Sequence, residues 1–165
     1  MELYLMRHGE AEAYACSGRD ADRSLTPSGI EQVTEVGMCL RSQHFKVDLI
    51  CASPYVRAAQ TADLIAREIH YPGHVENLNS LAPSGSVEET CSDLEHWRHR
   101  DRILLVGHMP HMAELLFFLM KDSKHAPAAF HKAAIACIVL KQLGQPGTLR
   151  WYRTPVDLIK QTVRS

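Results

Sequence analysis

The chain begins with the stretch LYLMRHG at residues 3–9, a short apolar run that leads directly into Arg7, His8 and Gly9. A run of this kind predicts a buried β-strand, and the glycine marks the point where the strand gives way to a loop. A histidine placed there, beside an arginine, is suited to act as a nucleophile next to a bound phosphate group. Arg-His-Gly occurs by chance in many chains, so the interpretation depends on two later segments with the same arrangement.

The rest of the chain alternates predicted helices and strands. Thr26 and Pro27 begin a helix that extends to about Arg41, with the threonine hydroxyl as N-cap and the proline at the first helical position. Residues 47–52 are apolar on both faces, which is typical of a buried parallel strand. A second helix, capped by Ser53 and Pro54, is predicted to reach about Ile69, and an outer strand follows near 74–76. A capping-box helix then runs from Ser86 to about Arg100. The last predicted elements are a strand at 103–106, a helix at 111–120, paired strands at 134–140 and 149–153 joined by a turn at 144–147, and a short helix after Pro155. This order predicts an α/β fold with a mostly parallel central sheet flanked by helices.

Length and composition indicate one ordinary globular domain spanning residues 1–165. The net charge of −1 gives no reason to expect nucleic acid or an acidic membrane surface as a partner. No apolar run approaches the roughly 20 residues that cross a bilayer, and we expect no signal peptide. The five cysteines are widely spaced and contain no C-x-x-C pattern, which argues against a disulfide framework and a zinc knuckle. We therefore expect a monomer in the reducing cytoplasm.

Three predicted strands deliver polar side chains to one edge of the sheet, where ligands of open α/β sheets bind. The first strand ends at Arg7 and His8, the second is followed by Arg57, and the strand at 103–106 is followed by His108. Arg57 falls in the first turn of its helix, so its guanidinium and the helix N-terminus face the same anion. With no nearby acid evident to neutralise them, these groups are suited to a phosphoryl group that carries about two negative charges.

The motifs around these residues resemble a known family. The segments LMRHG at 5–9, SPYVRAAQTA at 53–62 and LLVGHMP at 104–110 are similar to the signature set of the histidine phosphatase superfamily. The short length, RSLTPSG at 23–29 and LAPSG at 81–85 are most similar to the small SixA-type phosphohistidine phosphatases. The resemblance covers essentially the whole chain, in order and spacing.

This resemblance implies a phosphoglycerate-mutase-like fold without a lid insertion, and a role for each matching residue. His8 would be the nucleophile that is transiently phosphorylated, while Arg7, Arg57 and His108 would hold the phosphoryl oxygens. Arg23 would be a further phosphate contact, although a solvated loop arginine explains it equally well. The chemistry requires neither a cofactor nor a metal. The implied partner is a protein that carries phosphohistidine in a phosphorelay or phosphotransfer system.

A neutral imidazole attacks phosphorus with one ring nitrogen, so the other nitrogen must keep its proton and be held by an acceptor, often a backbone carbonyl. We therefore expect such an acceptor next to His8. Phosphoryl transfer depends mainly on positioning and charge stabilisation, which the arginines and His108 are expected to supply.

The chain departs from the wider family at the proton donor. Many phosphomonoesterase and mutase members have a glutamate after the third strand, whereas residues 77–81 here read NLNSL, with Asn79 and Ser80 at the centre. Glu88 and Glu89 follow, and their capping-box position gives them a structural explanation. The imidazole of phosphohistidine leaves readily once its ring is protonated, and it can take that proton from water or His108, whereas an alkoxide needs a positioned acid. A site lacking this glutamate therefore favours phosphohistidine as substrate.

Several alternatives remain open from the sequence. Cys51 and Arg57 have the C-x5-R spacing of the protein tyrosine phosphatases, although the loop has no glycine and Cys51 lies within an apolar run. His108, His111 and Glu114 form an H-x-x-H-x-x-E pattern, and His96 and His99 repeat its spacing, which raises the question of a metal site. The other functions to consider are a small-molecule phosphomonoesterase of the same superfamily and a phosphate-binding regulatory module without turnover.

Overall fold

A computed structural model describes residues 1–120 and 130–162 of the chain. The described elements, in chain order, are β1 (Glu2–Arg7), η1 (Asp20–Asp22), α1 (Pro27–Ser42), β2 (Leu49–Ala52), α2 (Val56–Glu68), β3 (Val75–Asn77), η2 (Asn79–Leu81), α3 (Val87–His96), β4 (Arg102–Gly107), α4 (His111–Met120), β5 (Ile135–Val139), β6 (Thr148–Arg153) and α5 (Pro155–Thr162). No helix among them is long and apolar enough to cross a membrane.

The strands form one sheet in the order β3-β2-β4-β1-β5-β6. The four strands from β3 to β1 are parallel, and β5 and β6 extend the sheet through antiparallel pairs. This confirms the predicted α/β fold with its mostly parallel sheet. The central strand β4 is buried from Ile103 to Gly107, as expected for a parallel strand covered on both faces.

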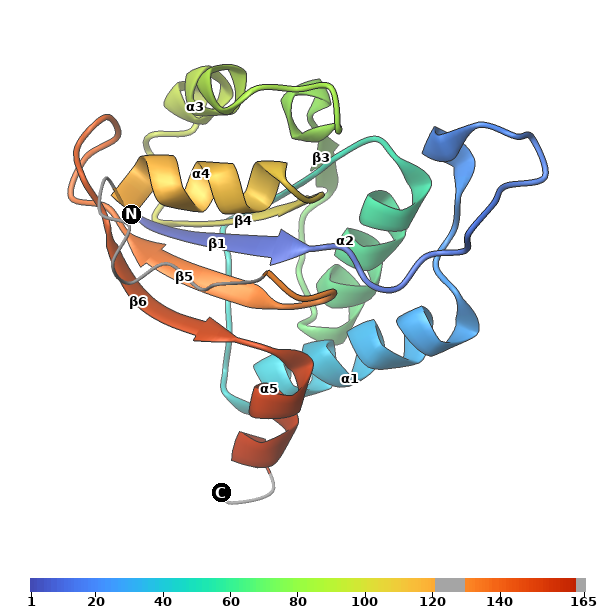
Figure 1. Cartoon of the computed structure of the whole chain (residues 1–165). Helices are drawn as coiled ribbons and strands as arrows, with labels where there is room; N and C mark the ends of the chain where they lie inside the picture. The colour runs from blue at the N-terminus through green and yellow to red at the C-terminus, as the bar shows by residue number, and fades with distance from the viewer. Residues whose placement is uncertain (121–129, 163–165) are drawn as a thin grey trace.

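The helices cover both faces of the sheet (Figure 1), and each face has its own apolar core. On one face α1, α2 and α5 pack around a core that includes Val36, Ile65 and Leu158. On the other face α3 and α4 pack around a core that includes Leu94 and Leu115. The side chains of a strand alternate between the two cores, because successive residues point to opposite faces.

Local capping chemistry explains where two helices begin. The Thr26 hydroxyl accepts a hydrogen bond from the Gly29 amide, and Pro27 is the first residue of α1, as predicted. Ser86 and Glu89 form both hydrogen bonds of a capping box at the start of α3. The predicted extent of α3 was too long, because the helix ends at His96.

The start predicted for α2 was wrong. The helix begins at Val56, with Tyr55 as an N-cap that makes no side-chain hydrogen bond. The Ser53 hydroxyl, which the sequence suggested as part of the cap, accepts a long hydrogen bond from the Tyr55 amide and bonds to a histidine of another strand end instead.

A close approach of the backbone explains the glycine of the Arg-His-Gly segment. A Cβ atom at Gly9 would lie 2.6 Å from the Val33 side chain of α1. A Cβ atom at Gly29, in the first turn of α1, would lie 2.1 Å from the carbonyl oxygen of Glu10. The loop after β1 therefore packs directly on the start of α1, which fixes the backbone on which His8 is carried.

Candidate active site

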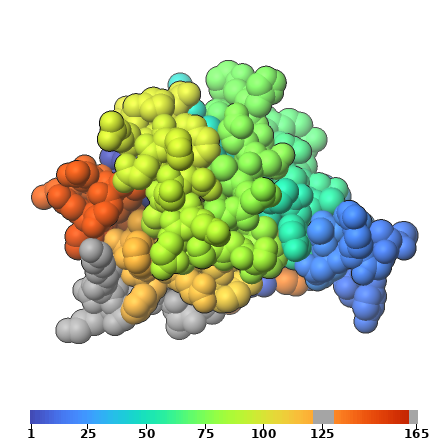
Figure 2. Space-filling view, turned by 90° about the horizontal axis from the view of Figure 1, so that it is seen from above, coloured from blue at the N-terminus to red at the C-terminus, as the bar shows by residue number. Residues whose placement is uncertain are grey.

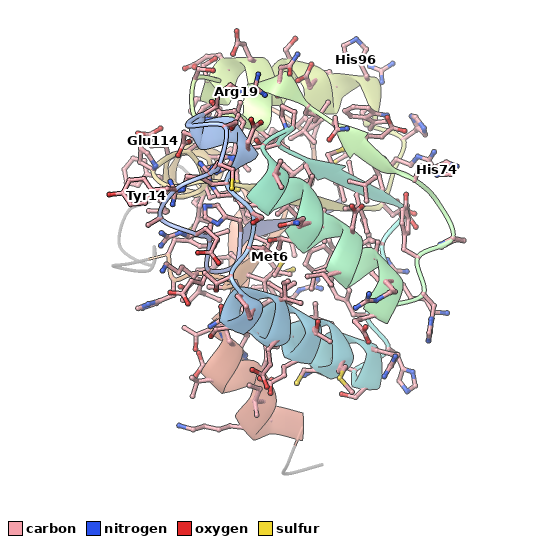
Figure 3. All side chains as sticks on the ribbon, turned by 90° about the vertical axis from the view of Figure 1, so that its right-hand side faces the viewer. Met6, Tyr14, Arg19, His74, His96 and Glu114 are labelled. Atoms are coloured by element: carbon pink, nitrogen blue, oxygen red, sulfur yellow. The ribbon has the colours of Figure 1, made fainter. Side chains whose placement is uncertain are left out.

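The candidate site lies at the edge of the sheet where β1, β2 and β4 end. Arg7 is in register with Gly107, and Ala52 is in register with Val106, so the residues that follow each strand meet at the same level. The backbone continues this arrangement, because the His8 amide donates to the carbonyl of Gly107. Figure 3 looks onto this edge, with Met6 of β1 near the centre and the loop bearing Tyr14 and Arg19 at one side.

The imidazole of His8 is held in one orientation by both of its nitrogens. Nδ1 lies 2.7 Å from the carbonyl oxygen of Gly9, so it carries the proton and donates it to that oxygen. Nε2 lies 3.3 Å from Nε of Arg57, which donates to it. Nε2 therefore holds a lone pair, and the expected carbonyl acceptor is the one of the next residue.

Burial keeps His8 neutral. Removal from water is the main cause that lowers the pKa of His8 to about 4. The Gly9 hydrogen bond opposes this effect, and the positive charges of Arg57, Arg7 and Arg23 add to it. At neutral pH the ring is therefore uncharged. A neutral imidazole whose Nε2 keeps its lone pair is the form that attacks phosphorus, and here that lone pair accepts the hydrogen bond from Arg57.

Arg57 is the most buried cation of the site, with 5% of its surface exposed. It is the second residue of α2 and so lies in the first turn, as predicted, and its guanidinium lies 5.0 Å from the centre of the Tyr55 ring. Its Nε faces His8, and its two Nη atoms donate to the backbone and side chain of Asp20. The guanidinium is thus fixed with one edge toward the imidazole and the other toward the loop after β1.

Asp20 corrects the expectation that no acid neutralises these cations. Its carboxylate accepts from Nη2 of Arg57 at 3.0 Å and from Nη1 of Arg23 at 2.6 Å. Its carbonyl oxygen accepts from Nη1 of Arg57 at 2.8 Å. Sequence reasoning missed this residue, and the available signal was the two acids between two arginines in RDADR at residues 19–23.

The other two arginines are partly engaged by the backbone. Nη1 of Arg7 donates to the carbonyl of Phe130, while its buried Nε has no partner among the described residues. Burial lowers the pKa of Arg7, which nevertheless remains a cation. Arg23 donates to the carbonyl of Glu12 as well as to Asp20, so the structure brings it to the same network as Arg57.

His108 lies beside His8, with the two ring centres 5.0 Å apart. Its Nε2 is 2.8 Å from the hydroxyl of Ser53, and its buried Nδ1 has no partner among the described residues. Burial, the largest cause, and the neighbouring His8 and Arg57 lower the pKa of His108 to about 3. His108 is therefore neutral at pH 7, which argues against its acting there as the source of a proton.

Ser53 is a second site residue that sequence reasoning misassigned. It is fully buried directly after β2, where its hydroxyl fixes the ring of His108 from the neighbouring strand end. Its place at the start of the SPYVR segment was the available signal.

The cysteine alternative fails on the environment of Cys51. The side chain is fully buried within β2 and packs in the core beneath α3 and α4. Burial, with the nearby charge of Glu76, raises the pKa of the thiol to about 12. Cys51 therefore lacks the thiolate that a nucleophile requires.

The histidine pattern on α4 has a structural explanation. His111 is buried and its Nε2 lies 3.0 Å from the hydroxyl of Thr90 on α3, while His108 bonds to Ser53. Within residues 1–120 and 130–162, no group of three His, Cys, Asp or Glu side chains could hold a metal ion.

The segment that would carry a family glutamate contains the short helix η2. Asn79 is exposed, and the Ser80 hydroxyl donates to the carboxylate of Asp93. Glu89 is engaged in the capping box, where its carboxylate accepts from the Ser86 amide at 3.0 Å. These contacts confirm the structural explanation for Glu89.

Comparisons with known proteins show which family this sequence and fold belong to. The model of the histidine phosphatase superfamily (branch 1) matches residues 3–81. Phosphohistidine phosphatase SixA of Escherichia coli is 29% identical over 96% of each chain. A SixA homologue of Haemophilus influenzae is 32% identical over 82% of this chain and 86% of its own. A solved structure of the protein histidine phosphatase SixA with tungstate superposes with a TM-score of 0.85, at 28% identity, over 96% of this chain and 99% of that one.

The solved SixA structure therefore agrees with the architecture of this chain. The chain belongs to the histidine phosphatase superfamily.

Proposed function

We propose that the protein is a phosphohistidine phosphatase, which removes the phosphoryl group from a histidine of a phosphorelay or phosphotransfer protein through phosphorylated His8. The main observation that supports this proposal is the orientation of the His8 ring, whose Nδ1 donates to the Gly9 carbonyl while the Nε2 lone pair faces the site. An imidazole fixed in this way is ready for attack without the loss of a proton.

The reaction has two steps in this proposal. First, Nε2 of His8 bonds to phosphorus as the bond from phosphorus to the substrate nitrogen breaks. The substrate ring, which carries a proton from water on its other nitrogen, keeps that electron pair and leaves as neutral imidazole. Second, water attacks the phosphoryl group on His8, which releases inorganic phosphate and returns the neutral imidazole. Through both steps Nδ1 keeps its proton and donates it in a hydrogen bond to the Gly9 carbonyl oxygen. This hydrogen bond stabilises the positively charged ring of the intermediate.

The remaining groups would hold the phosphoryl oxygens. Arg57 has its Nε directed at the attacking nitrogen, and Arg7 has a buried Nε with no protein partner among the described residues. His108 lies next to His8, and its buried Nδ1 has no partner among the described residues. When the neutral ring carries its proton on Nδ1, this N–H can donate to a phosphoryl oxygen. Arg23 reaches the same network through Asp20 and is proposed as a further phosphate contact.

The absence of an acid on η2 supports phosphohistidine over alkyl phosphates. Asn79 and Ser80 offer no proton at the pH of the cell, and Glu89 is engaged in its cap. The relatives named SixA support the same substrate class. We further propose that residues 1–165 act as one catalytic domain, because both described cores pack on a single sheet.

A comparison of phosphorylated donors tests this function. We expect rapid hydrolysis of a phosphohistidine peptide and of phosphoimidazole, with slow hydrolysis of serine phosphate. Rapid quenching should trap acid-labile, base-stable phosphate on the wild-type protein. His8→Ala should trap none and lose turnover, whereas the exposed control His74→Ala should behave as wild type.

Two results would contradict the proposal. Turnover of His8→Ala within tenfold of wild type would remove the nucleophile. Tight binding of phosphate with no turnover of any donor would favour a phosphate-binding module instead.

A further inference from the structure

An apolar groove lies outside the site, between the start of α3 and the exposed side of α4. Its volume is about 890 Å³, and its walls include Val87, Ala113, Phe117 and Phe118. The two phenylalanines are 52% and 43% exposed. Adjacent aromatic side chains that line an open groove indicate a surface that binds another molecule.

The groove begins near the active-site edge of the sheet. α4 starts at His111, three residues after His108, and Phe117 lies six residues further along the helix, which is about 9 Å. The opposite wall begins at Gly85, shortly after η2, at the carboxyl end of β3. Figure 2 looks onto this face, where the atoms of α4 lie beside those of the segment that enters α3.

The walls of the groove carry acidic groups. Glu88 on α3 and Glu114 on α4 both line it, and neither carboxylate forms a hydrogen bond or ion pair within the described part of the chain. α3 contains four acidic residues and no lysine or arginine. In Figure 3 Glu114 appears on the same side of the view as Arg19, which belongs to the loop that carries Asp20.

The charges of the groove and of the site are therefore opposite in sign. The site has three arginines that suit the phosphoryl group. The groove has carboxylates that suit cations and that have no partner within the described residues. A partner that matches both the site and the groove presents a phosphorylated side chain to the site. Further along the surface, by about the distance from the start of α4 to Phe117, it presents apolar side chains flanked by lysine or arginine. An anionic membrane surface matches neither Glu88 nor Glu114.

We propose that this groove is the docking surface for the protein that carries the phosphohistidine. Apolar side chains of the carrier pack against Phe117 and Phe118, and its basic side chains lie beside Glu88 and Glu114. The inference rests on the proposed function. It adds that the groove, which lies outside the reacting groups, helps the enzyme to select its substrate. The groove then lowers KM for a carrier protein and leaves the chemical step unchanged.

Two helical peptides, each with one phosphohistidine, provide the probes. One has leucine and lysine in the two turns after the phosphohistidine, a span of about 11 Å, and the other has serine and glutamate there. Phosphoimidazole serves as a donor too small to reach the groove. We expect the wild-type protein to have a KM about tenfold lower for the leucine-lysine peptide than for the serine-glutamate peptide.

Variants of the groove make the test specific. The double variant Phe117→Ser with Phe118→Ser, and the double variant Glu88→Gln with Glu114→Gln, should each raise KM for the leucine-lysine peptide by about tenfold. Neither should change kcat, nor kcat/KM for phosphoimidazole. Met38→Ser is the matched control, because Met38 is a similarly exposed apolar residue on α1, beneath the opposite face of the sheet.

The outcomes separate this inference from the function on which it rests. Equal KM values for both peptides, unchanged in the groove variants, would overturn the docking surface and leave the phosphohistidine phosphatase standing. Failure to hydrolyse phosphoimidazole as well as both peptides would overturn the function and the inference together. Concentration-dependent dimerisation of wild type that the phenylalanine variant abolishes would assign the groove to a second copy and overturn the inference alone.

Discussion

The carboxylate of Asp20 forms an ion pair with the guanidinium of Arg57, with Oδ2 3.0 Å from Nη2. The two partners differ in burial, because the side chain of Arg57 is 6% exposed and that of Asp20 is 54% exposed. The other carboxylate oxygen of Asp20 bonds to Arg23. A half-exposed acid thus occupies donors on two of the arginines that are proposed to hold the phosphoryl group, so the carboxylate and the phosphoryl group compete for them.

Asp20→Asn should therefore bind inorganic phosphate more tightly. Hydrogen bonds from Arg23 and Arg57 lower the pKa of Asp20, so the competing group is a carboxylate at neutral pH. Its removal should lower the inhibition constant of phosphate about three- to tenfold, a modest effect because Asp20 is largely exposed. Asp22→Asn is the matched control, since Asp22 pairs with Arg19 instead. Weaker phosphate binding by Asp20→Asn would show that Asp20 orients Arg57 and does not compete.

The acid limb of activity should lie far below the usual range of histidine. Burial lowers the pKa of His8 to about 4, whereas an unperturbed histidine titrates near 6.5. As pH falls through about 4, Nε2 gains a proton and loses the lone pair that attacks phosphorus. Above that pH the ring is neutral, so kcat/KM should not fall through protonation of His8 between pH 8 and 5.

The nitrogen chemical shifts of His8, followed from pH 8 to pH 3, measure the pKa of the ring directly. Because no substrate is present, the ionisation of a substrate does not affect the result. They should report a proton on Nδ1 and a midpoint near 4. A midpoint above 6 would show that burial does not control this ring.

Ser53→Ala should destabilise the protein without removing any group proposed to bind phosphate. The Ser53 hydroxyl is the partner of Nε2 of His108, and both side chains are buried. A buried polar atom that loses its partner costs about 1–3 kcal/mol. Urea unfolding at pH 7 measures this loss, and Ser17→Ala, which removes an exposed hydrogen bond to Asp22, is the control. A loss no larger than that of the control would show that the contact contributes little.

Local sequence signals predicted most of the fold and the main site residues. The helix caps at Thr26 and Ser86 depend on side chains within three residues, and the strand ends at His8 and His108 follow from apolar runs that stop at polar residues. Such signals are short-range, so they appear in the sequence.

The roles of Asp20 and Ser53 depend on contacts that no local pattern encodes. Asp20 lies in η1, a three-residue helix without hydrophobic periodicity, and meets Arg57 across 37 positions of the chain. Ser53 precedes a helix and so resembles a cap, but the hydroxyl bonds to His108 across 55 positions. Both contacts arise only when separate strand ends and loops are brought to the same edge of the sheet.

Hydrolysis should depend steeply on the pKa of the leaving group, because the described site offers no acid where the family glutamate would stand. Cleavage of an alkyl phosphate expels a strongly basic alkoxide, for which general acid catalysis contributes about 10²–10⁴-fold. The imidazole of phosphohistidine leaves readily once its ring is protonated. Ser80 donates to Asp93, and the carboxylate of Glu89 is held by the Ser86 amide, so neither supplies that proton to an alkoxide.

We therefore expect phosphohistidine to be cleaved fastest, aryl phosphates at intermediate rates that rise as the phenol becomes more acidic, and alkyl phosphates slowest. Values of kcat/KM for a series of substituted aryl phosphates measure the dependence, with phosphoimidazole and serine phosphate as the two extremes. Hydrolysis of serine phosphate or a sugar phosphate at a rate comparable to that of phosphohistidine would contradict the prediction. Loss of that activity in Glu88→Gln or Glu89→Gln, with phosphoimidazole cleavage retained, would then identify the acid.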